Sequence, residues 1–293
     1  MTDAAYQKHF SSSFKKYKSV ISRSAKRIAS LVDEVVRRPK TSASYWTKVS
    51  AAIDQEYNIM QRALQQWAKE ALPGEYAAQI ANAVEELAKA EKMIITAADV
   101  VARVEEQRST VAITSRLGRE AVVDMAAAIS SGKKLTHKLL KATQQTVLDE
   151  SVMNSALGKA YAQGDIRLFK DLLYDNRPET KAWFDMINEG KLVEVNGRRY
   201  HPDYYAELVA RTKFHDVQSQ ATMATAEYVG SDLVQVSNHN TTTPMCMEHE
   251  GQVYSISGTH PDYPPLVEYP PFHPNCLHTL HVVFEWALKG GAA

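Results

Sequence analysis

Apolar residues recur at helical spacing through the first half of the chain. From Trp46 to Trp67 they follow steps of three and four residues, which predicts an amphipathic helix with one apolar face. Three breaks interrupt the pattern, at Pro39, at Pro73-Gly74 and at Ser130-Ser131-Gly132, and they are expected to end helices because proline and glycine are poor helix formers. The pattern predicts five helices, over residues 14–36, 46–67, 75–106, 111–129 and 135–161.

After about residue 165 the elements become shorter. A short helix is predicted over residues 166–173 and a longer one over residues 203–228. The dipeptide Asn196-Gly197 stands between two short runs and favours a hairpin turn. Alternating apolar and polar residues predict three strands, over residues 232–237, 252–256 and 279–284. The prolines of residues 261–274 predict an irregular loop.

These elements predict an α+β protein in two parts. Residues 1–164 form a long-helix region, which is either a bundle or an extended arm that docks on a larger assembly. Residues 165–293 form a compact α+β domain with a Cys/His-rich loop.

The charge is unevenly distributed between these parts. The whole chain of 293 residues carries 34 Lys+Arg and 34 Asp+Glu, but residues 1–40 hold ten basic and three acidic residues, and residues 201–293 hold three and ten. The basic first helix would attract DNA or an acidic partner, or it is a solvated face. No base-reading motif accompanies it. Its candidate partner-binding residues are Lys15, Lys16, Lys18, Arg23, Lys26 and Arg27.

Other classes of protein have little support in the sequence. No run of 18 apolar residues predicts a membrane span, and the first ten residues lack the apolar core of a secretory signal. Two cysteines do not make a disulfide framework, so synthesis in a reducing cytosol is expected. Neither GxxxxGK nor GxGxxG occurs, so nucleotide chemistry is not indicated.

Cysteine and histidine residues gather around the proline-rich loop. Cys246-x-x-His249 precedes the loop and His273-Pro-Asn-Cys276-x-His278 closes it, with His239 and His281 further out. Thiolate and imidazole are preferred ligands of zinc, and a loop with little core gains stability from such a cross-link. Two alternatives remain open: buried free cysteines with surface histidines, and a Cys/His nucleophile pair.

Four ordered blocks of the C-terminal half carry a family resemblance. The first runs from Gly197 through Tyr204 to Arg211-Thr212, and the second is Gly230-Ser231-Asp232-Leu233-Val234 through His239. The third joins Pro244-Met245-Cys246 to Gly251-Gln252-Val253-Tyr254-Ser255-Ile256-Ser257, and the fourth is Tyr269-Pro270-Pro271-Phe272-His273-Pro274-Asn275-Cys276-Leu277-His278. In these blocks the chain resembles the phage minor capsid, or head morphogenesis, superfamily.

The resemblance implies a set of zinc ligands. The family's Cys/His positions fall on His239, Cys246, His273, Cys276 and His278, and the preferred quartet is His239, Cys246, Cys276 and His278, with His273 as the alternative fourth ligand. The chain departs from its relatives at Thr243, where some have a further cysteine, and at Leu277, where arginine is usual. Thr212 and Gly251 also match the motif. Arg211 is expected to pair with a carboxylate such as Asp232 or to hold a loop carbonyl.

The resemblance also implies a function. It predicts a minor capsid or head morphogenesis protein of a tailed phage or prophage, assembled in the host cytoplasm and present in few copies inside the head near the portal. Portal protein and major capsid or scaffold proteins are the expected partners, and DNA contact or ejection with the DNA would suit the basic helix. The alternative is a capsid-carried Cys/His-dependent enzyme or toxin-like effector, although no catalytic motif supports an enzyme.

Overall fold

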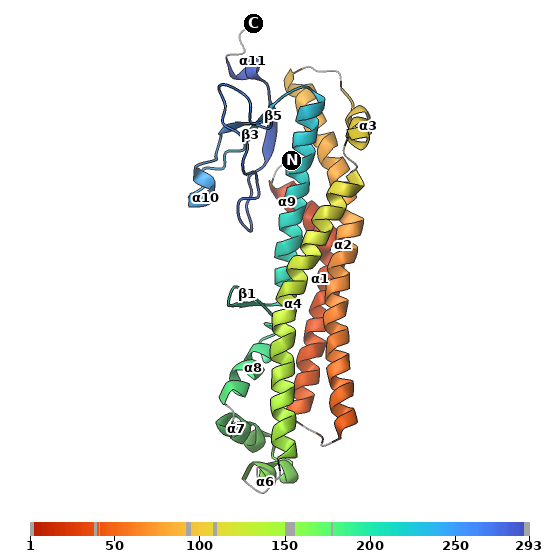
Figure 1. Ribbon diagram of the computed structural model, residues 1–293, viewed down its shortest axis with the longest axis vertical. Helices are drawn as coiled ribbons and strands as arrows, with labels where there is room; N and C mark the ends of the chain where they lie inside the picture. The colour runs from red at the N-terminus through yellow and green to blue at the C-terminus, as the bar shows by residue number, and fades with distance from the viewer. Residues whose placement is uncertain are drawn as a thin grey trace. The chain divides into compact units, whose positions relative to one another are not determined.

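The computed structural model describes most of the chain (Figure 1). The described residues are 3–37, 40, 42–91, 95–107, 110–149, 156–176 and 178–289. The helices are α1 (Asp3–Arg37), α2 (Ala43–Glu91), α3 (Ala97–Gln107), α4 (Thr110–Leu148), α6 (Ala156–Gln163), α7 (Ile166–Asn176), α8 (Pro178–Asn188), α9 (Pro202–Tyr228), α10 (Pro244–Met247) and α11 (Glu285–Leu288). The strands are β1 (Val193–Val195), β2 (Arg198–Tyr200), β3 (Leu233–Val236), β4 (Val253–Ser255) and β5 (Leu280–Val283). Among these helices, none combines the length and apolarity that crossing a membrane requires.

The α+β class is confirmed, with long helices followed by small antiparallel sheets. Helices are present in all five predicted regions, but their boundaries differ. The predicted helix over residues 75–106 is the end of α2 followed by the separate α3, and the helix expected to reach residue 161 is divided between α4 and α6. The helix α8 was not predicted. Pro39, the predicted end of the first helix, lies outside the described residues.

The predicted helix end at Pro73 is wrong, because this proline lies inside α2, a continuous helix of 49 residues. An interior proline removes one backbone hydrogen bond and destabilises a helix by about 3 kcal/mol. Leu72 and Tyr76, on either side of Pro73, are fully buried, as are Trp67 and Ile80. Burial of large apolar side chains contributes about 1.5–3 kcal/mol each, so this continuous buried face outweighs the missing hydrogen bond.

The predicted helix end at Gly132 is also wrong, because α4 runs through it from Thr110 to Leu148. A Cβ atom at Gly132 would lie 1.6 Å from the backbone oxygen of Leu192. The glycine therefore serves close packing of the chain before β1 against the helix. This approach involves residues 60 positions apart, so it is not visible in the local sequence.

The chain divides into two compact units, each assembled from separate stretches. The first unit comprises Met1–Lys15, Gln65–Ala121 and Leu208–Ala293, and the second comprises Lys16–Leu64 and Val122–Glu207. This division follows contacts and not the order of the chain, and the predicted boundary at residue 164 stays a prediction.

Within each unit the long helices pack against one another, as a bundle does. In the second unit, the Tyr57 hydroxyl on α2 lies 3.1 Å from the Thr136 hydroxyl on α4, and Arg27 on α1 pairs with Glu56 on α2 at 2.9 Å. In the first unit, four fully buried rings from α1, α2 and α9 form an aromatic cluster with centroid separations of 5.5–6.4 Å. The aromatic cluster consists of Phe10, Phe14, Trp67 and Phe214.

The first unit also contains an antiparallel sheet with strand order β4-β3-β5, of which β3 and β5 are labelled in Figure 1. Leu233 of β3 pairs with Ser255 of β4 and with Val283 of β5. Alternate side chains of this sheet pack against the end of α9 around a small sheet cluster. The sheet cluster is the buried group Ala226, Val234, Val236 and Leu280.

Two further predictions concern the loops. β1 and β2 pair as a hairpin across Asn196-Gly197, which both adopt positive φ, as this turn requires. The proline-rich segment is irregular, as expected. It is held against α9 by hydrogen bonds from Ser219 to the Pro270 carbonyl at 2.6 Å and from Gln220 to the Tyr269 hydroxyl at 2.8 Å.

Candidate metal centre

Two cysteines face each other between α10 and the start of β5. Cys246 lies on the single turn of α10, and Cys276 lies four residues before β5; both are fully buried or nearly so. Their sulfur atoms are 4.0 Å apart and the cysteines are free. The two chain segments are placed by the β3–β5 pairing and by the turn that follows α10.

Two histidines lie near the sulfurs: His273 forms a group with both cysteines, and His278 lies beside Cys276. One ligand atom each of Cys246, His273 and Cys276 lies within 4.8 Å of the others. The Nδ1 atom of His278 lies 3.5 Å from the Cys276 sulfur, and His278 is 3% exposed. A tetrahedral zinc ion with ordinary bond lengths separates two sulfur ligands by about 3.8 Å and a sulfur from a nitrogen by about 3.5 Å. The sulfur–sulfur separation and the separation between Cys276 and His278 are therefore close to those of a zinc site.

The hydrogen bonds of the histidines determine which ring nitrogen is available. Nδ1 of His273 lies 2.8 Å from the Pro274 carbonyl, which can only accept, so Nδ1 carries the proton and Nε2 keeps its lone pair. Nε2 of His278 lies 2.9 Å from a carboxylate oxygen of Glu250, which leaves the lone pair on Nδ1, the atom near Cys276. Both rings thus present a ligand nitrogen.

The other candidate histidines lie outside this group. His239 is exposed, and its Nε2 lies 2.8 Å from the Ser237 hydroxyl, although its ring packs edge-on against His278 at 4.9 Å. His249 stacks on Phe272 at 4.2 Å and bonds to the Tyr254 hydroxyl at 2.8 Å. Of the two histidines considered for the fourth position, His273 is the one that the structure brings to the cysteines.

The environment of Cys246 opposes ionisation of a metal-free thiol. Burial, followed by the neighbouring Cys276, raises the pKa of the Cys246 thiol to about 12. A thiol with this pKa is almost entirely protonated at neutral pH and is a poor nucleophile. A bound divalent cation reverses this, because it deprotonates its thiol ligands.

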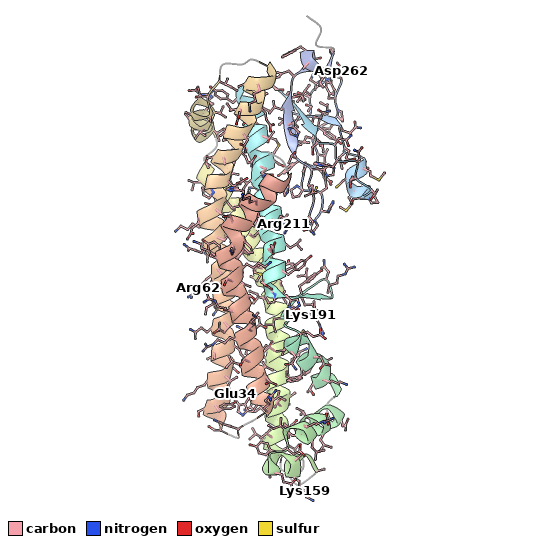
Figure 2. All side chains as sticks on the ribbon, turned by 180° about the vertical axis from the view of Figure 1, so that it is seen from behind. Glu34, Arg62, Lys159, Lys191, Arg211 and Asp262 are labelled. Carbon is pink, nitrogen blue, oxygen red and sulfur yellow. The ribbon has the colours of Figure 1, made fainter. Side chains whose placement is uncertain are left out.

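Arg211 lies on α9 (Figure 2), and its side chain contacts both this region and the aromatic cluster. Its Nη1 donates to the side-chain oxygen of Asn275 at 2.6 Å, and its guanidinium carbon lies 5.6 Å from the Phe10 ring centroid. Asp232, one of the partners expected for Arg211, accepts from the hydroxyls of Ser255 and Ser257, and Arg211 donates to the side-chain oxygen of Asn275. The serines of the adjoining strand and turn satisfy Asp232 locally, and Arg211 holds a side-chain oxygen next to Cys276.

The other motif positions have structural roles. The Thr212 hydroxyl bonds to the Leu208 carbonyl one turn earlier in α9, at 3.0 Å. Gly251 has a φ of +71° in the turn between α10 and β4, a conformation that side chains other than glycine's rarely adopt.

The basic residues of α1 differ in their surroundings. Lys18 pairs with Glu207 of α9, and Arg27 pairs with Glu56 of α2. Lys15, Lys16, Arg23 and Lys26 are exposed on the same helix. Lys18 and Arg27 thus have acidic partners on neighbouring helices, although the Arg27 side chain is 71% exposed, and we define the basic face of α1 as Lys15, Lys16, Arg23 and Lys26.

Sequence reasoning missed Glu250. Its carboxylate accepts from His278, from the His239 backbone amide at 2.8 Å and from the Thr241 amide at 3.1 Å. Burial alone would raise the pKa of Glu250, but these hydrogen bonds lower it below its usual value. The available signal was general: a metal-binding histidine usually donates its second ring N–H to a carboxylate or carbonyl.

Comparison with known proteins gives one match. The family model described as phage minor capsid protein 2 matches residues 29–286, which include most of the helices and the whole candidate metal centre. No curated protein and no solved structure gives a significant match.

Proposed function

Because the chain belongs to the phage minor capsid protein 2 family, we propose that it is a structural component of the virion of a tailed phage or prophage. It is present in few copies inside the head, next to the portal, and joins the portal and the major capsid or scaffold proteins in the host cytoplasm. The helices are the docking element and the sheet region is a rigid end. The match over residues 29–286 carries this proposal.

The location is tested on purified particles. Mass spectrometry of gradient-purified virions should detect the protein at a few copies per particle, and chemical cross-linking of intact heads should join its helices to the portal. Absence from purified virions overturns the structural role. Presence in virions with cross-links to the major capsid protein alone overturns the position at the portal.

The cysteine and histidine group is a zinc site in this proposal. Cys246, Cys276, His273 and His278 supply two sulfurs and two nitrogens, a donor set that zinc prefers over calcium or magnesium. The ion joins α10 to the segment before β5 and closes the irregular loop between the two cysteines. A region with a small apolar core gains most from such a cross-link.

Metal analysis tests this part separately. The purified protein should contain about one zinc per chain, and both thiols should resist alkylation until a chelator is added. Reactive thiols in protein without metal would instead favour the enzyme alternative. The high pKa of metal-free Cys246 argues against a thiolate nucleophile, so we propose a structural rather than a catalytic role for the cysteines.

The basic face of α1 binds an acidic surface of a partner virion protein in this proposal, and packaged DNA is the other polyanion that it would attract. The test replaces Lys15, Arg23 and Lys26 with glutamine and measures binding to purified portal protein and to duplex DNA. A matched control replaces Lys134, Lys138 and Lys141, a second exposed row on α4.

Loss of portal binding in the first variant alone supports the assignment. Loss of DNA binding alone, with a steep decrease in wild-type affinity between 50 and 200 mM salt, would show that the basic face binds DNA and not the portal. Equal effects of the two variants would mean that neither row of basic residues is a specific binding surface and that both act only through their charge.

A further inference from the structure

Glu250 lies directly behind the candidate metal ligand His278. It follows α10 by three residues, and its side chain is 11% exposed while that of His278 is 3% exposed. The carboxylate has hydrogen-bond donors on both oxygens: the His278 ring at 2.9 Å, the His239 amide at 2.8 Å and the Thr241 amide at 3.1 Å. A buried carboxylate with three donors is held in one orientation.

This arrangement determines the state of His278. The carboxylate accepts a hydrogen bond from Nε2–H of the ring, so the proton of the neutral imidazole stays on Nε2 and the lone pair lies on Nδ1. That Nδ1 atom is the one 3.5 Å from the Cys276 sulfur. Without the carboxylate, the two tautomers of the ring would compete, and rotation of the ring would be less restricted.

We propose that Glu250 is a positioning residue of the metal centre: it holds His278 in the tautomer and orientation that present Nδ1 to the ion. The inference rests on the proposed zinc site and adds a residue that does not touch the metal. Through the amides of His239 and Thr241, the same carboxylate links the ion to the loop between β3 and α10. Zinc binding therefore orders this loop as well as the ligands.

A neighbouring glutamate provides a matched control. Glu248 lies two residues before Glu250, but its side chain is 74% exposed and lies 3.7 Å from the His249 ring and not at His278. Glu250→Gln and Glu248→Gln remove the same charge from the same turn. The net charge of the acidic region therefore changes equally, and the hydrogen bond to His278 is lost only in Glu250→Gln.

The experiment measures zinc affinity of the full-length protein by competition with a chromophoric chelator. Glu250→Gln should weaken zinc binding by about 10- to 100-fold, the usual effect of removing such a partner, and Glu248→Gln should leave it unchanged. Cobalt-loaded Glu250→Gln protein should keep the thiolate charge-transfer bands of the wild type, because its ligands are the same. Equal zinc affinity of wild type and Glu250→Gln overturns the inference, as does an equal loss in both variants.

A second measurement does not depend on the stability of a variant. Nitrogen NMR of the zinc-loaded wild type should show His278 protonated at Nε2 and metal-bound at Nδ1, with slow amide exchange at His239 and Thr241. A ring bound through Nε2, or protonated at Nδ1, overturns the inference. Failure of the wild type to bind zinc is a distinct result, which overturns the proposed zinc site itself.

Discussion

The helical core and the sheet region of the first compact unit are stabilised by different means. The aromatic cluster joins α1, α2 and α9 through four large, fully buried rings in direct contact. The sheet cluster has four smaller buried side chains, and the residues packed on it are only partly buried. Around the sheet, polar contacts are prominent: α9 holds the irregular loop through Arg211, Ser219 and Gln220.

A cross-link contributes most to stability where the apolar core is small. Buried apolar area is the main favourable term in folding, and a region with little of it depends on metals, disulfides or polar networks. The cysteine and histidine group is placed in the region with the smaller apolar core. The helices should therefore tolerate metal removal and respond to cavities, whereas the sheet region should respond to loss of its polar and metal contacts.

The largest effect should come from a cavity in the aromatic cluster. The Trp67 side chain is fully buried and contacts Phe10 and Phe14. Trp67→Ala should lower the free energy of unfolding by about 3–5 kcal/mol, because it removes the transfer term and leaves a void. Urea denaturation followed by circular dichroism measures this. Trp286→Ala, at a 58% exposed position, should change stability by less than about 0.5 kcal/mol, and similar losses in both variants would contradict the assignment of the core.

A buried histidine should make the helical core sensitive to acid. Burial of His215 on α9, assisted by the charge of Arg211, lowers its pKa from 6.5 to about 4. Between these values the unfolded chain binds more protons than the folded one, so stability is lost as the pH falls from 6.5 toward 4. At about 1.4 kcal/mol per pH unit, the loss is about 3 kcal/mol.

Chemical denaturation of the metal-free protein at pH 6.5 and pH 4 measures this dependence. His215→Gln should reduce it by most of that amount, and His201→Gln, at an exposed position, should not. If His215→Gln kept the full dependence, the acid sensitivity would belong to other groups.

The long helices could be predicted from the sequence, but two of their boundaries could not. Helical periodicity located the long helices, because a buried face imposes a repeat on every turn. It failed at Pro73, where the buried Leu72 and Tyr76 outweigh a lost hydrogen bond, and at Gly132, where the backbone of Leu192 approaches the helix. Both failures arise from tertiary packing, which local propensity does not include.

For the candidate site, residue types were visible and their selection was not. The cysteines and the candidate histidines stand out by type and spacing near the proline-rich loop. Which histidine faces the sulfurs depends on the hydrogen bonds of each ring, such as that of His278 to Glu250, 28 positions away. His239 matches the motif equally well in sequence but is exposed and bonded to Ser237. Partner contacts of this kind appear only in three dimensions.

Removal of the proposed zinc ion should affect the sheet region more than the helices. With free zinc at 100 times its dissociation constant, a chelator should lower stability by about 2.7 kcal/mol. Hydrogen exchange should show faster exchange in β3 and β5 and little change around the aromatic cluster. Cys276→Ser protein should lack zinc and show no further loss with chelator. If the helices and strands lost protection equally, the two regions would share one stabilising core, contrary to the comparison.

The smallest effect should come from Arg211, the residue that contacts both regions. Its guanidinium lies over Phe10 of the aromatic cluster and donates to Asn275, the residue before Cys276. Arg211→Ala should lower the free energy of unfolding by about 1.5 kcal/mol and weaken zinc binding, because it removes a charged hydrogen bond and frees the segment that carries Cys276.

The same substitution should raise the pKa of His215, since the charge of Arg211 helps to lower it. Arg211→Lys keeps a positive charge but loses the planar fork, so it should preserve the His215 titration, as followed by NMR, while still weakening zinc binding. The two variants thus separate the charge felt by the helical core from the geometry needed by the metal centre. Unchanged zinc affinity in both would mean that the two regions are stabilised independently, even at the residue that contacts both.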